Sequence, residues 1–244
     1  MQKILLSIFC SLLAFSASAQ HHEKPKAEHA PQVSYIGFNT LKSDHKAANV
    51  KTFLEYIKTI TPLMEAQGMD LVVYKVDHAS DPEKPVDFIT FGTAKDQQSF
   101  QAFFANEDFQ KAFPTLVGIT ENHFVSFVDS PVIPEKVHGG HTQLSLDWLK
   151  STDKAMMKQV AVLNHKVEGI AAHHGARQTH RVAGQFASTG LTDDIAPAEA
   201  PTIVSVWHMK DPHGFLEHSE VSRLNKQAAE NSKMFRSYWI SPAT

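Results

Sequence analysis

A tryptophan and three histidines lie close together near the C-terminus, in the stretch TIVSVWHMKDPHGFLEH of residues 202–218. Trp207 and His208 end a short apolar run, and His213 and His218 follow within the next ten residues. Indole and imidazole groups take part in cofactor, metal and aromatic-ligand sites, so this spacing could form a binding site. The pattern is also typical of a buried strand that leads into a helix.

The other histidines lack the spacing of a tight metal site. Zinc and copper need three or four ligands that converge on one point. His165 and His173 are eight residues apart in an expected helix, about two turns, so their side chains cannot chelate one ion together. Adjacent His173 and His174 would point to different helix faces. We predict no metal centre here, and we expect His208 to be a hydrogen-bonded core residue.

The composition and motifs exclude several functional classes. The 244 residues include 23 basic and 26 acidic side chains, so no basic field for nucleic acid exists. The sequence contains neither a Gly-x-Ser-x-Gly elbow nor a phosphate-binding glycine loop, which argues against hydrolase or nucleotide chemistry. After the N-terminal run, no stretch is apolar enough to predict a membrane span.

Residues 1–19 have the features of a secretory signal peptide. A lysine precedes the apolar run of residues 4–15, and the small residues 17–19 form a motif that signal peptidase accepts. Cleavage would remove Cys10, the single cysteine, so the mature protein would form no disulfide. Residues 20–32 are polar and contain prolines, which predicts a flexible leader. We therefore expect a periplasmic or secreted protein.

The rest of the chain shows one order of elements twice, in residues 33–130 and 141–244, with a Pro-rich hinge at residues 131–140. In each half, alternating apolar residues predict strands and three-and-four spacing predicts amphipathic helices, in the order βαββαβ. The first helix of each half is expected to stop at a glycine, Gly68 or Gly175.

The two halves also match around the third strand. The segment TIVSVWHMKDPHGFL aligns with FITFGTAKDQQSF at a constant offset, so that Asp211 falls on Asp96 and Phe215 falls on Phe100. Asp96 is expected to cap one long helix at residues 97–113. The second half differs by a longer loop at residues 188–201. We predict that the halves are two copies of one unit.

This tandem βαββαβ unit resembles the ferredoxin-like dimeric α+β barrel superfamily, which includes the antibiotic biosynthesis monooxygenase-like proteins. The likeness is strongest in FITFGTAKDQQSFQAFFANEDFQKAF, which is similar to the family's strand, Lys/Asp turn and phenylalanine-rich helix. In that family two units pair their sheets into a barrel. The resemblance implies an α+β fold with two tandem ferredoxin-like units that form an intramolecular pseudo-dimeric α+β barrel, for which a monomer would suffice.

The family's fold suggests which face of each sheet lies under the helices. The consistently apolar set, including Ile89, Phe91, Val204 and Val206, is expected there. The alternate set is then expected to face the barrel interior and line a cavity. It contains Asn39, Gly92, Asp147, Ser205 and Trp207. Because Gly92 matches Trp207, the first unit would be open where the second unit is filled or carries a site.

Haem-degrading enzymes of this superfamily use an asparagine on the first strand, a tryptophan on the third and a haem-ligating histidine on the second helix. By this resemblance Asn39 matches only in the first unit and Trp207 only in the second. The nearest histidines, His213 and His218, lie near the start of the helix, whereas the family ligand lies near its end. The set is split, so we predict no cofactor and keep haem as the lesser alternative.

A cofactor-independent oxygenase of this fold needs an apolar pocket and a group that accepts or orients a proton. The candidate residues are Asp147, Asn39 and His180 for catalysis and Trp207, Ser205 and Gly92 for ligand binding. Burial would raise the pKa of Asp147 and suit it to proton transfer. The competing interpretation is that Asp147 is a satisfied strand-end residue and Trp207 fills the core.

These patterns together predict an exported protein that binds a small apolar or aromatic molecule, with cofactor-independent monooxygenation as the candidate activity. The alternative is a non-enzymatic haem- or metal-binding envelope protein. Neither nucleic acid nor a membrane span is expected among its partners.

Overall fold

The computed structural model describes residues 33–81, 83, 85–128, 130–134, 140–183, 187–190 and 200–243. The expected signal peptide and leader lie outside the described residues, as do parts of the expected hinge and of the loop at residues 188–201. The chain divides into two compact units. The first comprises Met1–Tyr74, Val86–Ile133 and Phe186–Ala198, and the second comprises Lys75–Pro85, Pro134–Gln185 and Glu199–Thr244.

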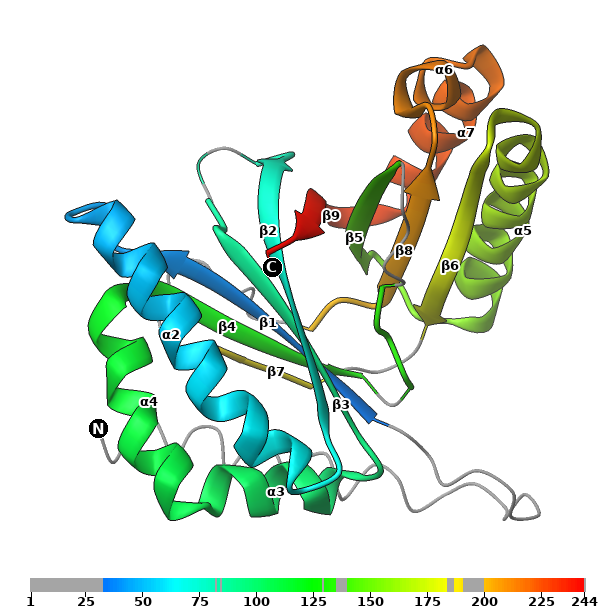
Figure 1. Cartoon of the computed structure of the whole chain (residues 1–244). Coiled ribbons are helices and arrows are strands. Elements are labelled where there is room, and N and C mark those ends of the chain that lie inside the picture. Colours follow the sequence, from blue (N-terminus) through cyan, green and yellow to red (C-terminus); the bar gives the residue numbers. More distant parts are fainter. Residues whose placement is uncertain are drawn as a thin grey trace. The chain divides into compact units, whose positions relative to one another are not determined.

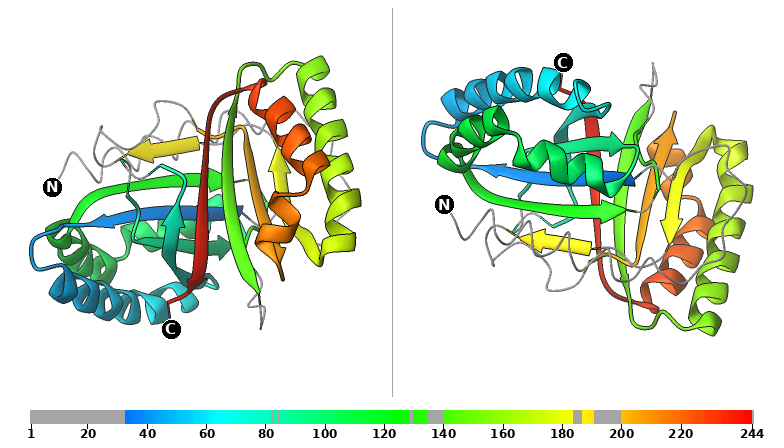
Figure 2. Two further views of the ribbon diagram at one scale, coloured as in Figure 1. Left: turned by 90° about the horizontal axis from the view of Figure 1, so that it is seen from above. Right: turned by 90° about the horizontal axis from the view of Figure 1, so that it is seen from below.

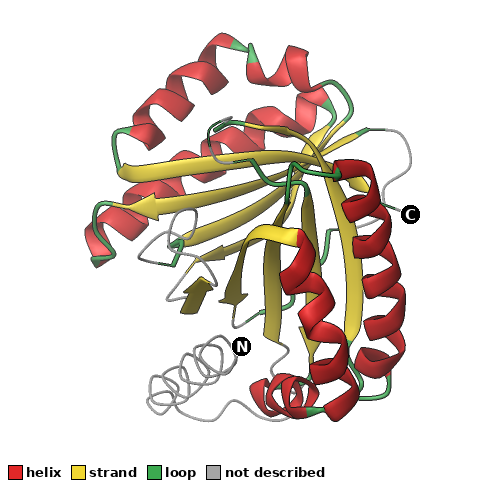
Figure 3. Ribbon diagram, turned by 90° about the vertical axis from the view of Figure 1, so that its left-hand side faces the viewer, coloured by secondary structure: helices red, strands yellow, loops and turns green. Residues whose placement is uncertain are grey.

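The first unit has its helices on one face of an antiparallel sheet (Figures 1 and 3). Strand β3 pairs with β1, which pairs with β4, and β4 pairs with β7. The strands are β1 (Val33–Leu41), β3 (Phe88–Ala94), β4 (Thr120–Val128) and β7 (Ala187–Gly190), together with the first half of β2 (Asp70–Ala79), which continues into the second unit from Lys75. The helices are α2 (Lys46–Glu65), α3 (Gln97–Ala105) and α4 (Glu107–Ile119).

The second unit repeats this arrangement, with α5 and α7 side by side on one face of its sheet (Figures 1 and 2). Its strands follow the order β6-β8-β5-β9. They are β5 (His141–Leu149), β6 (Ala176–Ala183), β8 (Ile203–Met209) and β9 (Ser232–Pro242). The helices are α5 (Lys154–Ala171), α6 (Pro212–Leu216) and α7 (Ser219–Ala229), with a 3-10 turn η1 (Ala172–His174) after α5. The predicted α+β class with two tandem ferredoxin-like units is confirmed.

Local signals explain the ends of several helices. The backbone N–H of Ser99 donates to the Asp96 side chain at 2.9 Å, so Asp96 caps α3 as expected. Gly68 and Gly175 follow helices with φ of 69° and 62°, a conformation that favours glycine. The prediction of one long helix at residues 97–113 is wrong, because Asn106 ends α3 and accepts hydrogen bonds from the first N–H groups of α4.

The loop expected at residues 188–201 contains a strand in its described part. Residues 187–190 form β7 and pair antiparallel with β4, from Ala187 opposite Phe127 to Gly190 opposite Phe124. The segment therefore lies between β6 and β8 in sequence but extends the sheet of the first unit.

The expected direction of the strand side chains is wrong in both units. Asn39 and Thr90 line a cavity together with α2 and α4 residues, and Asp147 and Trp207 line one with α5 and α7 residues. The apolar set lies on the opposite face of the sheets. The physical reason is that every residue of β3 and β8 is buried, so hydrophobicity could not distinguish the two faces.

Candidate functional site

The second unit contains a cavity of about 420 Å³ between its sheet and its helices. Strands β5, β6 and β8 supply the floor, α5 and α7 supply the walls, and α6 contributes Phe215 and Leu216. Small-molecule pockets in proteins have volumes of roughly 300–1,000 Å³, so this cavity has the size of a ligand site.

Most of the cavity wall is apolar. The wall contains Val160, Leu163, Val167, Ile203, Met209, Leu224, Ala228 and Ala229. Trp207 lies at one end, where its ring is 5.9 Å from that of Phe215. With the Gln178 amide oriented to suit its neighbours, its oxygen accepts from Trp207 Nε1 at 3.2 Å and its nitrogen donates to Glu168 Oε1 at 2.8 Å. The indole is therefore held by both packing and a hydrogen bond.

Polar side chains cross the floor of the cavity in one row. Arg181 of β6 lies opposite Ser205 of β8, which lies opposite Ser145 of β5. All three line the cavity. Burial lowers the pKa of Arg181, while the carboxylates of Glu168 and Asp147 oppose that shift. The floor thus offers hydroxyl groups and one cation to whatever occupies the cavity.

Asp147 lies at the other end of the cavity, opposite Ile203 on β8 and Phe235 on β9. Burial raises the pKa of its carboxyl group, and a hydrogen bond to Ser232 and the charge of Arg181 act in the opposite direction. Its Oδ1 atom is buried and has no hydrogen-bond partner among the described residues. A carboxylate oxygen without a partner can accept a hydrogen bond or a proton from a bound molecule.

The structure brings three of the six predicted site residues together, namely Asp147, Ser205 and Trp207. His180 does not line the cavity. A β-bulge between Gln178 and His180 shifts the register, so that His180 lies opposite Val206 and Arg181 takes the cavity side. The Nδ1 atom of His180 is 3.2 Å from Thr179 Oγ1.

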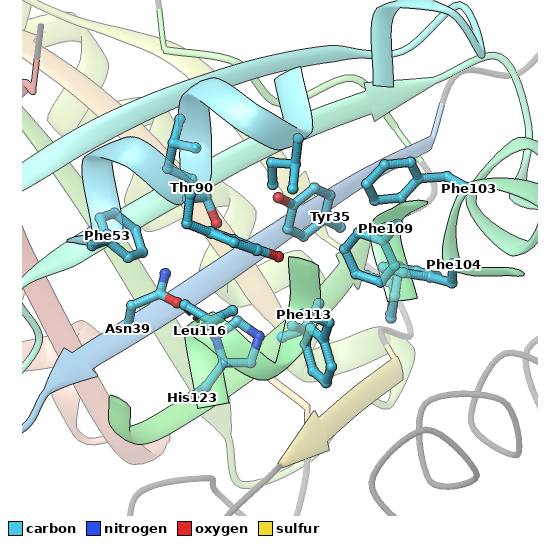
Figure 4. A pocket seen from close by; sticks show the side chains of 15 residues that line it. Tyr35, Asn39, Phe53, Thr90, Phe103, Phe104, Phe109, Phe113, Leu116 and His123 are labelled. Atoms are coloured by element: carbon cyan, nitrogen blue, oxygen red, sulfur yellow. Dashed lines mark hydrogen bonds between the residues drawn. The ribbon is translucent and has the colours of Figure 1, made fainter. Parts of the chain in front are cut away.

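Asn39 and Gly92 belong to the first unit, where the equivalent space is almost filled. The cavity there has a volume of about 50 Å³ and is lined mainly by phenylalanine and tyrosine rings (Figure 4). The open space expected at Gly92 is absent, since a Cβ atom there would overlap Cε1 of Tyr35. Asn39 is buried, and its Oδ1 is 2.7 Å from Nδ1 of His123.

Several lining residues were not predicted. Arg181 was hidden by the bulge, which leaves no mark in a single sequence. Gln143 lies on the cavity side by alternation from Asp147, so the strand pattern could have identified it. Phe235, with 52% of its surface exposed, was assigned only to a strand.

The lining does not fit a haem held by an imidazole or thiolate ligand. Among the described residues that line the cavity, none is histidine or cysteine. The part of the chain that the structure describes also contains no group of three or more His, Cys, Asp or Glu side chains that could hold a metal ion. Within the described helices, none is long and apolar enough to cross a membrane.

Comparison with solved structures agrees with this fold. A candidate monooxygenase from Lactobacillus acidophilus superposes with a TM-score of 0.52 at 10% identity over 88% of this chain and 95% of that one. An anthrone oxidase-like protein gives 0.54 at 10% identity, over 89% and 94%. A doubly substituted chlorite dismutase from Candidatus Nitrospira defluvii gives 0.51 at 12% identity, over 88% and 93%. The chain has the dimeric α+β barrel fold. No family model matches it, and no curated protein matches its sequence.

Proposed function

We propose that the second unit binds a small, largely apolar or aromatic molecule in the cavity between its sheet and helices. The observation that carries the proposal is the difference in volume at equivalent places, about 420 Å³ in the second unit against about 50 Å³ in the first. A core that served only packing would be expected to close to native density in both copies.

The lining also indicates the chemistry of the ligand. Apolar walls and the Trp207 ring suit a flat or hydrocarbon body. At the other end, the free Oδ1 atom of Asp147 suits a hydrogen-bond donor such as a hydroxyl group. Ser205 and Arg181 can receive carbonyl or hydroxyl oxygens along the floor. A hydroxylated aromatic molecule satisfies all three features.

The finer proposal is that the bound molecule is oxygenated without a cofactor. Two of the similar structures are a candidate monooxygenase and an anthrone oxidase-like protein, which supports this reaction class. Asp147 would accept a proton from the ligand's hydroxyl group, which raises the electron density of the ring before it reacts with dioxygen. One oxygen atom would then become a carbonyl oxygen of the ligand, and the other would leave as water with two hydrogens that the ligand loses, so the ligand itself supplies the electrons. A raised carboxyl pKa brings Asp147 nearer to the range that suits such a transfer.

Binding is tested by titrating the protein with 1-naphthol and following tryptophan fluorescence. We expect a saturable change that disappears in Ala228→Phe, which adds a ring inside the cavity. The matched control is Val162→Phe, because Val162 is 47% exposed and the same ring would lie in solvent. Equal binding by both variants would contradict the proposal.

Oxygenation is tested separately, by dioxygen uptake with the hydroxylated aromatic that binds. Asp147→Asn should keep binding within a few-fold and lower the turnover rate by about 10²–10⁴. If the unsubstituted protein binds the ligand but takes up no dioxygen, the oxygenation proposal fails and the protein only binds its ligand. Added haem should give no Soret band shifted by protein ligation, because the described lining offers no imidazole.

We also propose export, on the basis of the signal-peptide features of residues 1–19. Expression of the full chain in a Gram-negative host, followed by intact mass measurement of the periplasmic fraction, should give a protein that begins at Gln20. An uncleaved cytoplasmic product would contradict this proposal.

A further inference from the structure

The first unit contains a small cavity of its own, in which polar atoms lie within a cage of aromatic rings (Figure 4). Its volume is about 50 Å³. One water molecule needs roughly 10–15 Å³ of such space, so the cavity can hold a molecule of several heavy atoms. The aromatic cage consists of Phe53, Phe103, Phe104, Phe109, Phe113 and Phe127.

The orientation of His123 leaves one ring nitrogen free. Asn39 Nδ2 lies 3.4 Å from the carbonyl oxygen of Phe88, which fixes the amide so that its oxygen faces His123. An amide oxygen only accepts, so Nδ1 of His123 carries the hydrogen of the 2.7 Å bond. Its Nε2 atom then carries a lone pair and has no hydrogen bond to the described residues.

Gly37 of β1 lies beside the His123 ring. A Cβ atom at Gly37 would lie 3.6 Å from Cε1 of His123 and 2.5 Å from Thr90 Oγ1, so the imidazole lies along β1 over a residue without a side chain. Because Nδ1 faces Asn39, the Nε2 atom on the far side of Cε1 is turned away from Asn39. Burial lowers the pKa of His123 to about 4, so the ring is neutral at pH 7.

Tyr56 of α2 supplies a second uncommitted group. Its side chain lines the same cavity, and its hydroxyl makes no hydrogen bond to the described residues. Burial raises its pKa, so the hydroxyl keeps its proton. The neighbouring Tyr35 hydroxyl is already hydrogen-bonded to Thr90. Among its described lining residues, the cavity therefore presents one uncommitted acceptor, Nε2 of His123, and one uncommitted hydroxyl, that of Tyr56. None of these lining residues carries an ionised group.

We propose that the first unit is a second, separate binding site, which takes a small uncharged molecule with a hydroxyl group between His123 and Tyr56. A hydroxyl group can donate to Nε2 of His123 and accept from Tyr56, which satisfies both free groups at once. Charged molecules are disfavoured because no ion in the lining would offset their desolvation. This site does not depend on the ligand proposed for the second unit. The class includes short alcohols and water itself.

The experiment follows the imidazole signals of His123 by NMR in protein with labelled histidine. Ethanol is the uncharged probe, and acetate and ethylammonium are charged probes of similar size. We expect a saturable shift of the Nε2 signal with ethanol at about millimolar concentration or above, as for other ligands of a few heavy atoms. Neither charged probe should produce one. Without ethanol, an ordered water should give a persistent water contact to the His123 ring.

Two variants test the assignment. Tyr56→Phe keeps the ring and removes the hydroxyl, so ethanol should bind at least several-fold more weakly. His123→Phe copies Phe235, the residue at the equivalent register of the second unit, and should abolish the site. The proposal would be overturned if the His123 signals showed neither ethanol binding nor a persistent water contact. Equal binding of the charged probes would also overturn it. Naphthol binding at the second unit should be unchanged in both variants, so the two proposals can fail independently.

Discussion

The two units have the same order of elements, yet the space between sheet and helices is open in one and nearly closed in the other. The helices explain part of the difference. In the first unit α4 places Phe109, Phe113 and Leu116 against the sheet. In the second unit α7 places Leu224, Ala228 and Ala229 there. Smaller side chains on one helix leave room for a ligand while the order of elements stays the same.

One pair of facing strand positions shows a more specific difference. Tyr35 lies opposite Gly92 in the first unit, and Gln143 lies opposite Trp207 in the second. Each pair contains one large aromatic ring, but the ring comes from the first strand in one unit and from the third in the other. The lesson is that each sheet accommodates a single ring at this point, and the strand that supplies it decides which side chains border the remaining space.

The largest effect should come from removing the ring in the second unit. Trp207→Gly should lower the free energy of unfolding by about 3–5 kcal/mol, because a buried ring leaves a void. Adding Gln143→Tyr should restore part of this loss, since it recreates the pair of the first unit. Chemical denaturation followed by circular dichroism measures both variants. If the changes in unfolding free energy caused by the two substitutions are simply additive, the two facing pairs are not equivalent.

The second effect concerns pH and distinguishes His123 from its counterpart Phe235. The pKa of His123 is about 4 in the folded protein and about 6.5 when unfolded, so the unfolded state binds more protons between these values. Stability is complete above pH 6.5 and should fall by up to about 3 kcal/mol as the pH drops to 4. Unfolding curves across this range should show a smaller loss in His123→Phe, and an equal loss would contradict the assignment.

A smaller effect is expected at the glycine of the first unit. Gly92→Ala should destabilise by about 1–3 kcal/mol, because the new Cβ atom would overlap the Tyr35 ring. The control is Gly118→Ala in α4, where a Cβ atom has nothing within 4 Å, and which should stabilise by about 0.5–1 kcal/mol. Thermal unfolding of the two variants should shift in opposite directions. Shifts in the same direction would show that Tyr35 does not occupy this space.

The smallest effect is expected at Asp147. Its carboxyl pKa is raised on folding, so the stability it contributes is present below about pH 3.8 and is lost as the pH rises through the folded pKa. Asp147→Asn should therefore stabilise at pH 7, by no more than about 1 kcal/mol because solvent screens part of the group. The gain should vanish near pH 3. In the first unit the equivalent Asn39 is already an amide, and Asn39→Asp should have the opposite effect at pH 7.

Most of the fold could be predicted because its signals are local. The capping Asp96 and the glycines at 68 and 175 each act within one turn, and the element order followed from them. The break at Asn106 was missed because the apolar spacing continues through it. Strand β7 was missed because a short strand at a sheet edge depends on its partner, β4, rather than on its own sequence.

The candidate site could be predicted only in part, and for reasons of sheet geometry. Alternation placed Asp147, Ser205 and Trp207 on a common face, and all three line the cavity of the second unit. It could not tell which face meets the helices, because both faces are buried. It also failed at His180, since one extra residue in β6 reverses the alternation and brings Arg181 to the cavity.

The placement of β7 has a consequence for how the protein is made. The outer edge of β4 receives its neighbour from residues 187–190, which are translated about 60 residues after β4 ends. On the ribosome the first unit must wait for about half of the second unit before its sheet is complete. A nascent chain that stalls within α5 would therefore present β4 as a bare strand edge, ready to pair with another chain.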